Sequence, residues 1–170
     1  GSEDAVVVNG TSFADALAAA SYAGQYGMPI VLSQKDKLPA ASSDVLKTLG
    51  VENTLAVGGK GALSDSVYKQ LPGAERVYGK DRYATSVALA EYFEPSLDVV
   101  YAATGQNFAD ALAGAALAAK HESGVILVGK TLSSEVENFF GGNEIGQVKV
   151  FGGKGAVSDE VLTESHKLIQ

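Results

Sequence analysis

The hexapeptide Phe-Ala-Asp-Ala-Leu-Ala occupies residues 13–18 and returns unchanged at residues 108–113. A second motif, Gly-Gly-Lys-Gly-Ala, occupies residues 58–62 and returns at residues 152–156, followed shortly in both copies by a Ser-Asp pair. Two ordered motifs at nearly constant separation indicate a tandem repeat, and a repeat has to be recognised before a fold is assigned.

The segment between the two copies, residues 76–86, has no counterpart elsewhere in the sequence. It reads Arg-Val-Tyr-Gly-Lys-Asp-Arg-Tyr-Ala-Thr-Ser. If this segment opens a repeat, the chain divides into residues 1–75, a unit that lacks its opening segment, and residues 76–170, a complete unit.

Short apolar runs alternate with amphipathic or small-residue stretches along both units, which predicts strands alternating with helices. The predicted strands are 5–9, 29–33, 53–57, 75–78, 98–103, 124–128 and 147–151. The predicted helices are 12–26, 42–49, 64–71, 82–93, 107–121, 133–140 and 158–168. Strands rich in Val and Ile without alternation are typical of parallel sheets covered on both faces. The expected fold is therefore α/β: tandem units, each a mostly parallel sheet flanked by helices in Rossmann-like or flavodoxin-like layers, with Phe13 and Phe108 buried at equivalent positions.

Composition excludes several classes of function. Hydrophobic residues make up 46% of the chain and charged residues 19%, which predicts a packed globular protein. No apolar run approaches the ~18 residues of a membrane helix, so membrane insertion is not expected. The absence of Cys excludes disulfides and thiolate sites, and a net charge of −7 argues against nucleic acid as a partner. An anionic partner would require positive charge gathered locally.

The first motif follows a predicted strand, and Ser12 there resembles the nucleophile of a hydrolase elbow. The second copy argues against catalysis, because Asn107 takes the same place and cannot act as an oxygen nucleophile. Ser and Asn share the ability to cap a helix, and Asp15 and Asp110 follow three residues later, as in a capping box. We therefore expect a structural role for this motif and no enzymatic activity.

The second motif allows two interpretations. Its backbone N–H groups could bind an anion beside a Lys, or its glycines could simply form a turn with positive φ. It matches neither a Walker motif nor a dinucleotide fingerprint, and no other spacing predicts a cofactor or a metal site. The residues concerned are Gly58, Gly59, Lys60, Gly152, Gly153 and Lys154.

Both arginines of the chain, Arg76 and Arg82, fall in the segment that has no counterpart. Arg is suited to bidentate pairing with carboxylate or phosphate, which makes an anionic ligand one interpretation. The other is an internal ion pair with Asp15 or Asp110. The helices after the first motif are rich in Ala and Gly, which favours close packing against the unit's own sheet or against a neighbouring repeat.

Taken in order, these motifs resemble one family, the type 2 cell wall binding repeat of clostridial and related surface proteins. The resemblance rests on an opening segment, a core and a glycine turn: Arg76, Gly79, Arg82, Tyr83 and Thr85; Asn107 to Ala113; Gly152 to Ser158. It implies an α/β repeat, usually in three copies about a pseudo-threefold axis. It also implies an extracellular module of Gram-positive-type cells that attaches surface or S-layer proteins non-covalently to an anionic secondary wall polysaccharide.

Two functions are therefore expected in order of preference. The first is non-catalytic binding of the polysaccharide, through Arg76, Arg82, Tyr83, Lys60 and Lys154. The second is a structural module that packs on neighbouring repeats without binding polymer. Because one Arg-Tyr helix, residues 82–93, serves two Asp-containing cores, we expect self-association, by a two-fold contact or by exchange of that helix.

Overall fold

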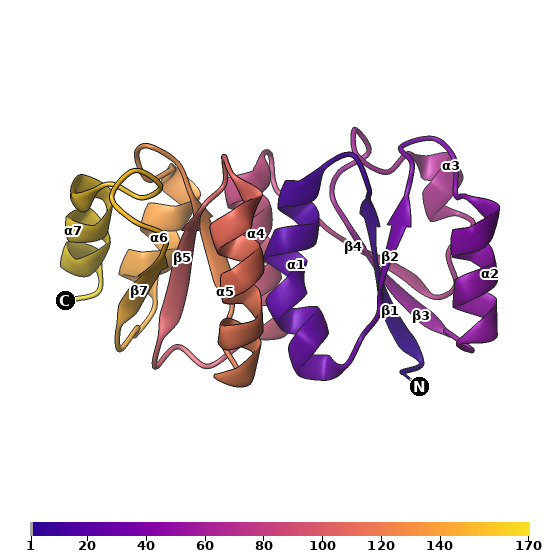
Figure 1. Cartoon of the computed structure of the whole chain (residues 1–170), viewed down its shortest axis with the longest axis horizontal. Coiled ribbons are helices and arrows are strands. Elements are labelled where there is room, and N and C mark those ends of the chain that lie inside the picture. The colour runs from indigo at the N-terminus through magenta and orange to yellow at the C-terminus, as the bar shows by residue number, and fades with distance from the viewer. Residues whose placement is uncertain (1) are drawn as a thin grey trace.

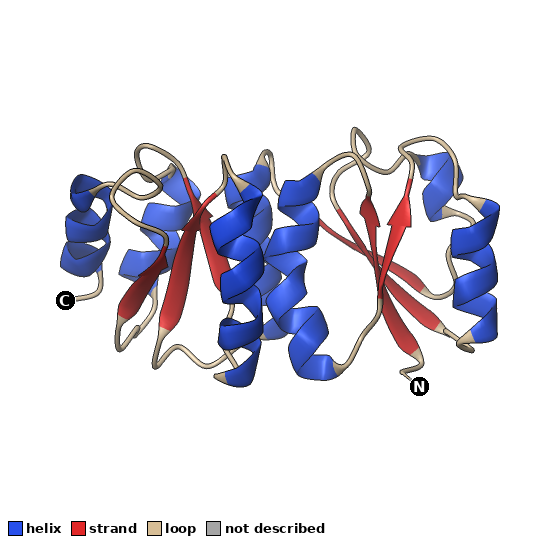
Figure 2. Cartoon of the chain, viewed as in Figure 1, coloured by secondary structure: helices blue, strands red, loops and turns tan. Residues whose placement is uncertain are grey.

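The computed structural model describes residues 2–170 (Figures 1 and 2). In these residues seven strands form two parallel sheets, and seven helices pack on the sheets. The first sheet has the order β2-β1-β3-β4 and the second the order β6-β5-β7. The strands are β1 (Asp4–Asn9), β2 (Ile30–Ser33), β3 (Asn53–Val57), β4 (Ala74–Val77), β5 (Val100–Thr104), β6 (Val125–Val128) and β7 (Val148–Phe151). The helices are α1 (Phe13–Tyr26), α2 (Ala40–Thr48), α3 (Asp65–Tyr68), α4 (Arg82–Phe93), α5 (Phe108–Lys120), α6 (Ser134–Gly142) and α7 (Asp159–Leu168). The predicted α/β fold is confirmed.

The largest boundary difference is at α3, which is shorter than the predicted 64–71. After Tyr68 the backbone tightens to i→i+3 hydrogen bonds, from Gln70 N to Val67 O and from Leu71 N to Tyr68 O. Pro72 follows, and a residue before proline is pushed away from helical backbone angles. The helix therefore stops one turn early.

The elements form five layers (Figure 1). Helices α2 and α3 cover the outer face of the first sheet, and α6 and α7 cover the outer face of the second. Helices α1, α4 and α5 lie between the two sheets, where α1 packs against both α4 and α5. None of the helices in residues 2–170 has the length and apolar character required to span a membrane.

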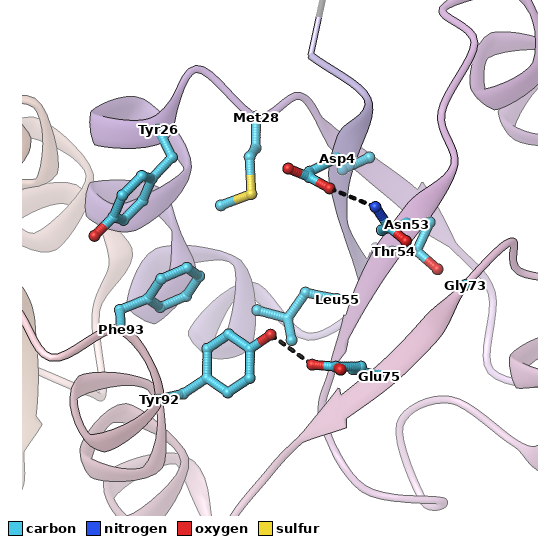
Figure 3. A pocket seen from close by; sticks show the side chains of 11 residues that line it. Asp4, Tyr26, Met28, Asn53, Thr54, Leu55, Gly73, Glu75, Tyr92 and Phe93 are labelled. Atoms are coloured by element: carbon cyan, nitrogen blue, oxygen red, sulfur yellow. Dashed lines mark hydrogen bonds between the residues drawn. The ribbon is translucent and has the colours of Figure 1, made fainter.

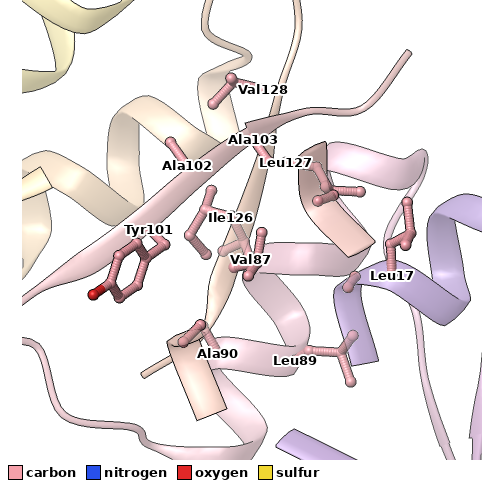
Figure 4. Packing of buried hydrophobic residues seen from close by; sticks show 14 of the residues in the cluster. Leu17, Val87, Leu89, Ala90, Tyr101, Ala102, Ala103, Ile126, Leu127 and Val128 are labelled. Atoms are coloured by element: carbon pink, nitrogen blue, oxygen red, sulfur yellow. The ribbon is translucent and has the colours of Figure 1, made fainter. Parts of the chain in front are cut away.

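One buried cluster runs through the central layer and joins both sheets. Figure 4 shows Leu17 of α1, Leu89 of α4, and Ile126 and Leu127 of β6 among the residues of this cluster. A second, smaller cluster fills the outer face of the first sheet beneath α2 and α3. The two sequence repeats therefore share a core.

Small residues bring α1 and α5 close together. A Cβ added at Gly24 of α1 would lie 3.3 Å from Ala119 Cβ of α5. On its other side α5 meets its own sheet, where the Phe151 ring occupies the space a side chain at Gly114 would need. Both interpretations of the small-residue helices are therefore correct, because the same helices approach their own sheet and the neighbouring repeat.

Sheets and sequence repeats are staggered. Strand β4 pairs with β3, so the division between residues 75 and 76 falls inside a strand of the first sheet. Helix α4, which follows directly, covers the edge strand of the second sheet, where Ser86 Oγ accepts a hydrogen bond of 2.9 Å from the Leu127 N–H. The opening segment thus completes the first sheet and protects an otherwise unpaired strand edge of the second.

The expected burial of Phe13 and Phe108 is wrong. Their exposed fractions are 40% and 54%, and the two rings contact each other edge to face with centroids 6.0 Å apart. Each is the first residue of its helix, at the end of the central layer and beyond the buried core. They are equivalent positions that pack across the repeat junction.

Candidate functional site

The two repeated motifs meet at the carboxyl ends of the strands, where open α/β sheets usually bind ligands. Gly58 has φ 113°, and a Cβ there would lie 3.0 Å from Asp15 Oδ2. Gly152 has φ 101°, and a Cβ there would lie 2.5 Å from Asp110 Oδ2. In each unit the Asp of the first motif therefore fills the space that glycine leaves in the second.

The helix starts differ between the units. Asn107 Oδ1 caps α5 by accepting a hydrogen bond of 3.3 Å from the Ala109 N–H. Ser12 occupies the N-cap position of α1 but makes no side-chain cap bond, and its Oγ donates to Asp15 Oδ2 at 3.4 Å. The Ser12 N–H is already bonded to Asn9 O at 3.1 Å, so the predicted capping box does not form.

Asp15 is a buried carboxyl group, 8% exposed. Burial raises its pKa above the ordinary value, against the hydrogen bond from Ser12 and the charge of Arg82, which lower it. Asp110 is more open, at intermediate burial. The two equivalent aspartates therefore sit in different environments.

Arg82 lies at the junction of the two units. As the first residue of α4 it projects from the helix start, which Asp81 caps by accepting bonds from Tyr83 N and Ala84 N at 3.0 and 2.9 Å. The guanidinium donates to Gly105 O in the second unit and lies 5.6 Å above the Phe13 ring of the first. Arg82 is also exposed to solvent, so its guanidinium contacts both units and remains accessible from outside.

Two cavities open at this end of the molecule. The Arg82 pocket, of about 290 Å³, lies where the starts of α1 and α4 converge on the first glycine motif; its lining includes Ser12, Asp15, Gly59, Gly61, Lys80, Asp81, Arg82 and Thr85. The Lys130 pocket, of about 340 Å³, lies at the corresponding end of the second sheet; its lining is Thr104, Gln106, Asn107, Gly129, Lys130, Gly155 and Ala156. The Tyr83 ring lies beside the second of these pockets, because it fills the space that a Cβ would need at Gly105 and at Gly129, and Gly129 lines the Lys130 pocket.

Arg76 lies apart from both pockets. Its Nη1 donates to Gly58 O at 2.8 Å and to Leu63 O at 2.9 Å, and its guanidinium lies 4.6 Å above the Tyr68 ring. Arg76 therefore braces the glycine loop from inside. It makes neither of the contacts with Asp15 or Asp110 considered from the sequence.

Lys60 and Lys154 are exposed and form equivalent ion pairs. Lys60 Nζ lies 2.9 Å from Asp65 Oδ2, and Lys154 Nζ lies 2.6 Å from Asp159 Oδ2. Each aspartate belongs to the Ser-Asp pair after its glycine motif. An ion pair exposed to solvent contributes little free energy, so both lysines can exchange their aspartate for another anionic partner.

A third ion pair was not predicted from the sequence. Lys80 Nζ lies 2.6 Å from Glu135 Oε1 at the start of α6, and this contact lowers the pKa of Glu135 to about 2. Lys80 and Glu135 are far apart in the sequence, and they meet because α4 packs beside α6 in the fold. The pair ties the opening segment to the start of α6 at Lys80, which also lines the Arg82 pocket.

Both histidines lie away from these pockets. His121 Nδ1 is 2.7 Å from Tyr101 OH, and His166 Nε2 is 3.1 Å from Val148 O. Within residues 2–170, no three His, Asp or Glu side chains gather in a way that could hold a metal ion.

Known proteins match both units. A family model described as cell wall binding domain 2 matches residues 2–68 and 76–162. The N-acetylmuramoyl-L-alanine amidase LytC of Bacillus subtilis is 34% identical over 161 residues, which are 94% of this chain and 32% of the amidase. The amidase enhancer of the same organism is 37% identical over 129 residues, 74% of this chain and 17% of the enhancer.

Two solved structures from Clostridium difficile share the fold. Cwp6 aligns with a TM-score of 0.89 and 26% identity, covering 99% of this chain and 28% of Cwp6. Cwp8 aligns with a TM-score of 0.82 and 28% identity, covering 98% of this chain and 29% of Cwp8. The chain thus spans about a third or less of each relative.

The two matched ranges contain both copies of each repeated motif. Domains of this kind act at the cell wall or cell surface, which is the location of this chain. With both of its units matched, the chain belongs to the cell wall binding domain 2 family.

Proposed function

We propose that this chain is a non-catalytic domain that holds the protein carrying it on the cell wall by non-covalent contact with an anionic wall polysaccharide. The observation that carries the proposal is the position of Arg82. Its exposed guanidinium stands at the junction of both units, beside the Arg82 pocket, and contacts residues of each. A polymer laid across this junction would meet both units at once.

Local charge supports an anionic ligand in spite of the overall charge of −7. Lys80 and the exposed Arg82 line the Arg82 pocket together with Asp81 and the buried Asp15, and Lys130 lines the neighbouring pocket, whose lining within residues 2–170 contains no Asp or Glu. The start of α1 lies at the Arg82 pocket without a side-chain cap, and helix N-termini favour anions, whereas Asp81 already caps the start of α4. Lys60 and Lys154 stand on the adjacent glycine loops, where an anionic chain could replace their aspartate partners.

The surroundings of Ser12 support a role without catalysis. Its hydroxyl donates to Asp15, while both histidines lie elsewhere, so neither His is in reach to activate Ser12 as a nucleophile. The amidase relative is matched over 32% of its length, which fits a binding domain beside a separate catalytic one.

Sedimentation with purified cell walls tests the proposal. Arg82→Gln should weaken wall binding by at least about tenfold, since a charge-assisted hydrogen bond is worth roughly 1.5–3 kcal/mol. Lys167→Gln, on the exposed face of α7, should bind as the parent chain does, and added salt should weaken binding of both. Circular dichroism must show that Arg82→Gln is folded. Equal binding to walls stripped of their anionic polymer would contradict the proposal.

A second candidate function, packing against neighbouring repeats or a second copy of the chain, is favoured by one face of α5. Phe108, Leu112 and Leu117 are 54%, 56% and 44% exposed, and exposed alanines lie between them. An apolar stripe of this kind usually marks an association site. Leu112→Asp should convert an associating chain to a monomer in analytical ultracentrifugation. A parent chain that is monomeric at micromolar concentration would remove this candidate.

A further inference from the structure

A third cavity lies at the opposite end of the first sheet, beside the amino ends of its strands (Figure 3). Its volume is about 360 Å³, within the range of small-ligand pockets. It is bounded by the last turns of α1 and α4 and by the starts of β1, β3 and β4. A strand length, roughly 20 Å, separates it from the Arg82 pocket.

Aromatic rings form one wall of this cavity. Phe93 stacks on Tyr26 with centroids 5.4 Å apart and meets Tyr92 edge to face at 5.0 Å. Tyr26 and Tyr92 are 50% and 47% exposed, although both are large rings next to the core. Phe93 covers one face of Tyr26, and the exposed parts of Tyr26 and Tyr92 remain accessible to a ligand.

Carboxylates from the strands line the cavity beside this ring wall. Glu75 Oε2 accepts a hydrogen bond of 2.6 Å from Tyr92 OH, and Asp4 Oδ1 accepts one of 3.0 Å from Asn53 Nδ2, as Figure 3 shows. Each carboxylate has a second oxygen outside these bonds. Among residues 2–170, the cavity lining contains these two acids and no Lys or Arg.

The hydrogen bond to Glu75 also fixes the protonation state of Tyr92. It is the main cause that raises the pKa of Tyr92 to about 12, with burial and the charges of Glu75 and Asp4 adding to it. The phenol therefore stays neutral and holds Glu75 in place against the ring wall. A fixed carboxylate beside exposed ring faces is complementary to a cation, because both the charge and the ring quadrupole attract it.

We infer that this cavity binds a primary ammonium group carried on a small, partly apolar frame such as an amino sugar. The ammonium would pair with Glu75, the charge of Asp4 would add to the attraction from further along the lining, and the frame would pack on Tyr92 and Tyr26. A neutral sugar could also stack on the rings, but it would leave the two negative charges without compensation. This site differs from the Arg82 pocket in place and in charge, so the inference goes beyond the proposed function.

The test uses the whole chain and three probes of similar shape: glucosamine, N-acetylglucosamine and glucose. Amide chemical shifts are followed by two-dimensional NMR during titration with each. We expect saturable shifts around Glu75 and Tyr92 with glucosamine, and affinity at least about tenfold weaker for the two uncharged probes. Equal affinity for all three would establish a neutral-sugar site and overturn the inference, as would a lack of saturable shifts with glucosamine.

Two variants locate the binding, each with a matched control. Glu75→Gln keeps the shape and removes the charge, and Tyr92→Leu keeps apolar volume and removes the ring; each should weaken glucosamine binding by about tenfold. Glu91→Gln and Tyr78→Leu, at exposed positions outside the cavity, should have no effect. Unchanged affinity in both Glu75→Gln and Tyr92→Leu would reject the site. Wall sedimentation of the same variants separates the two proposals, because it depends on the Arg82 pocket.

Discussion

Replacing Gly58 by Ala adds a single methyl group and should lower the protein's free energy of unfolding by a measurable amount. Gly58 has φ 113°, where side chains are rare, and the added Cβ would lie 2.9 Å from Ala62 Cβ and 3.0 Å from Asp15 Oδ2. The backbone conformation costs about 1–3 kcal/mol for a residue other than glycine. Crowding in a packed site costs a further 1–3 kcal/mol or so. The expected loss is about 2–6 kcal/mol.

Gly61→Ala is the matched control, because it lies in the same loop and a Cβ there meets nothing within 4 Å. Urea denaturation followed by circular dichroism gives the free energies of unfolding. Shortening the partner in the double variant Gly58→Ala, Asp15→Ala should recover part of the loss. If Gly58→Ala and Gly61→Ala differ by less than about 0.5 kcal/mol, the size of a typical surface effect, the motif contact has no energetic importance.

Three further outcomes are expected from urea or acid denaturation. Burial raises the pKa of Asp15, so its ionised form costs stability at neutral pH; Asp15→Asn should be the more stable protein there, and its advantage should shrink as pH falls towards the ordinary Asp pKa of about 4. A stability difference independent of pH would contradict this cause. The pKa of Glu135 is lowered to about 2 by Lys80, so the pair stabilises the fold at neutral pH; the deficit of Glu135→Gln should disappear as pH falls from the ordinary Glu pKa of about 4.3 towards 2. Ser86→Ala leaves a buried strand N–H without its acceptor and should cost about 1–3 kcal/mol, whereas Ser66→Ala on the surface should cost almost nothing.

The repeat, the number of elements and their types could be predicted from the sequence, because apolar runs and motif spacing are local signals. Contacts between distant elements could not. The sequence shows that Asp15 and Gly58 both belong to repeated motifs, but their contact depends on β1 and β3 being neighbours in the sheet. Strand order is set by crossover geometry and is not encoded in periodicity.

The same limit applies to single side chains. The two arginines look alike in the sequence, yet Arg76 lies on a strand and turns into the glycine loop, whereas Arg82 begins a helix at the surface. The bond between Tyr92 and Glu75 joins the end of α4 to β4, two elements whose side-by-side placement no local pattern specifies. Site residues could therefore be nominated from the sequence, and their roles required the fold.

The stagger between sheets and sequence repeats bears on how arrays of this family change length during evolution. A sheet takes its last strand from the opening segment of the following repeat, as β4 shows. Unequal recombination removes or duplicates one whole period wherever the crossover falls within it. Each sheet then still receives a strand from the repeat that comes next, and each opening helix still finds an edge to cover. Gene duplication can thus lengthen or shorten such an array without breaking a strand pair.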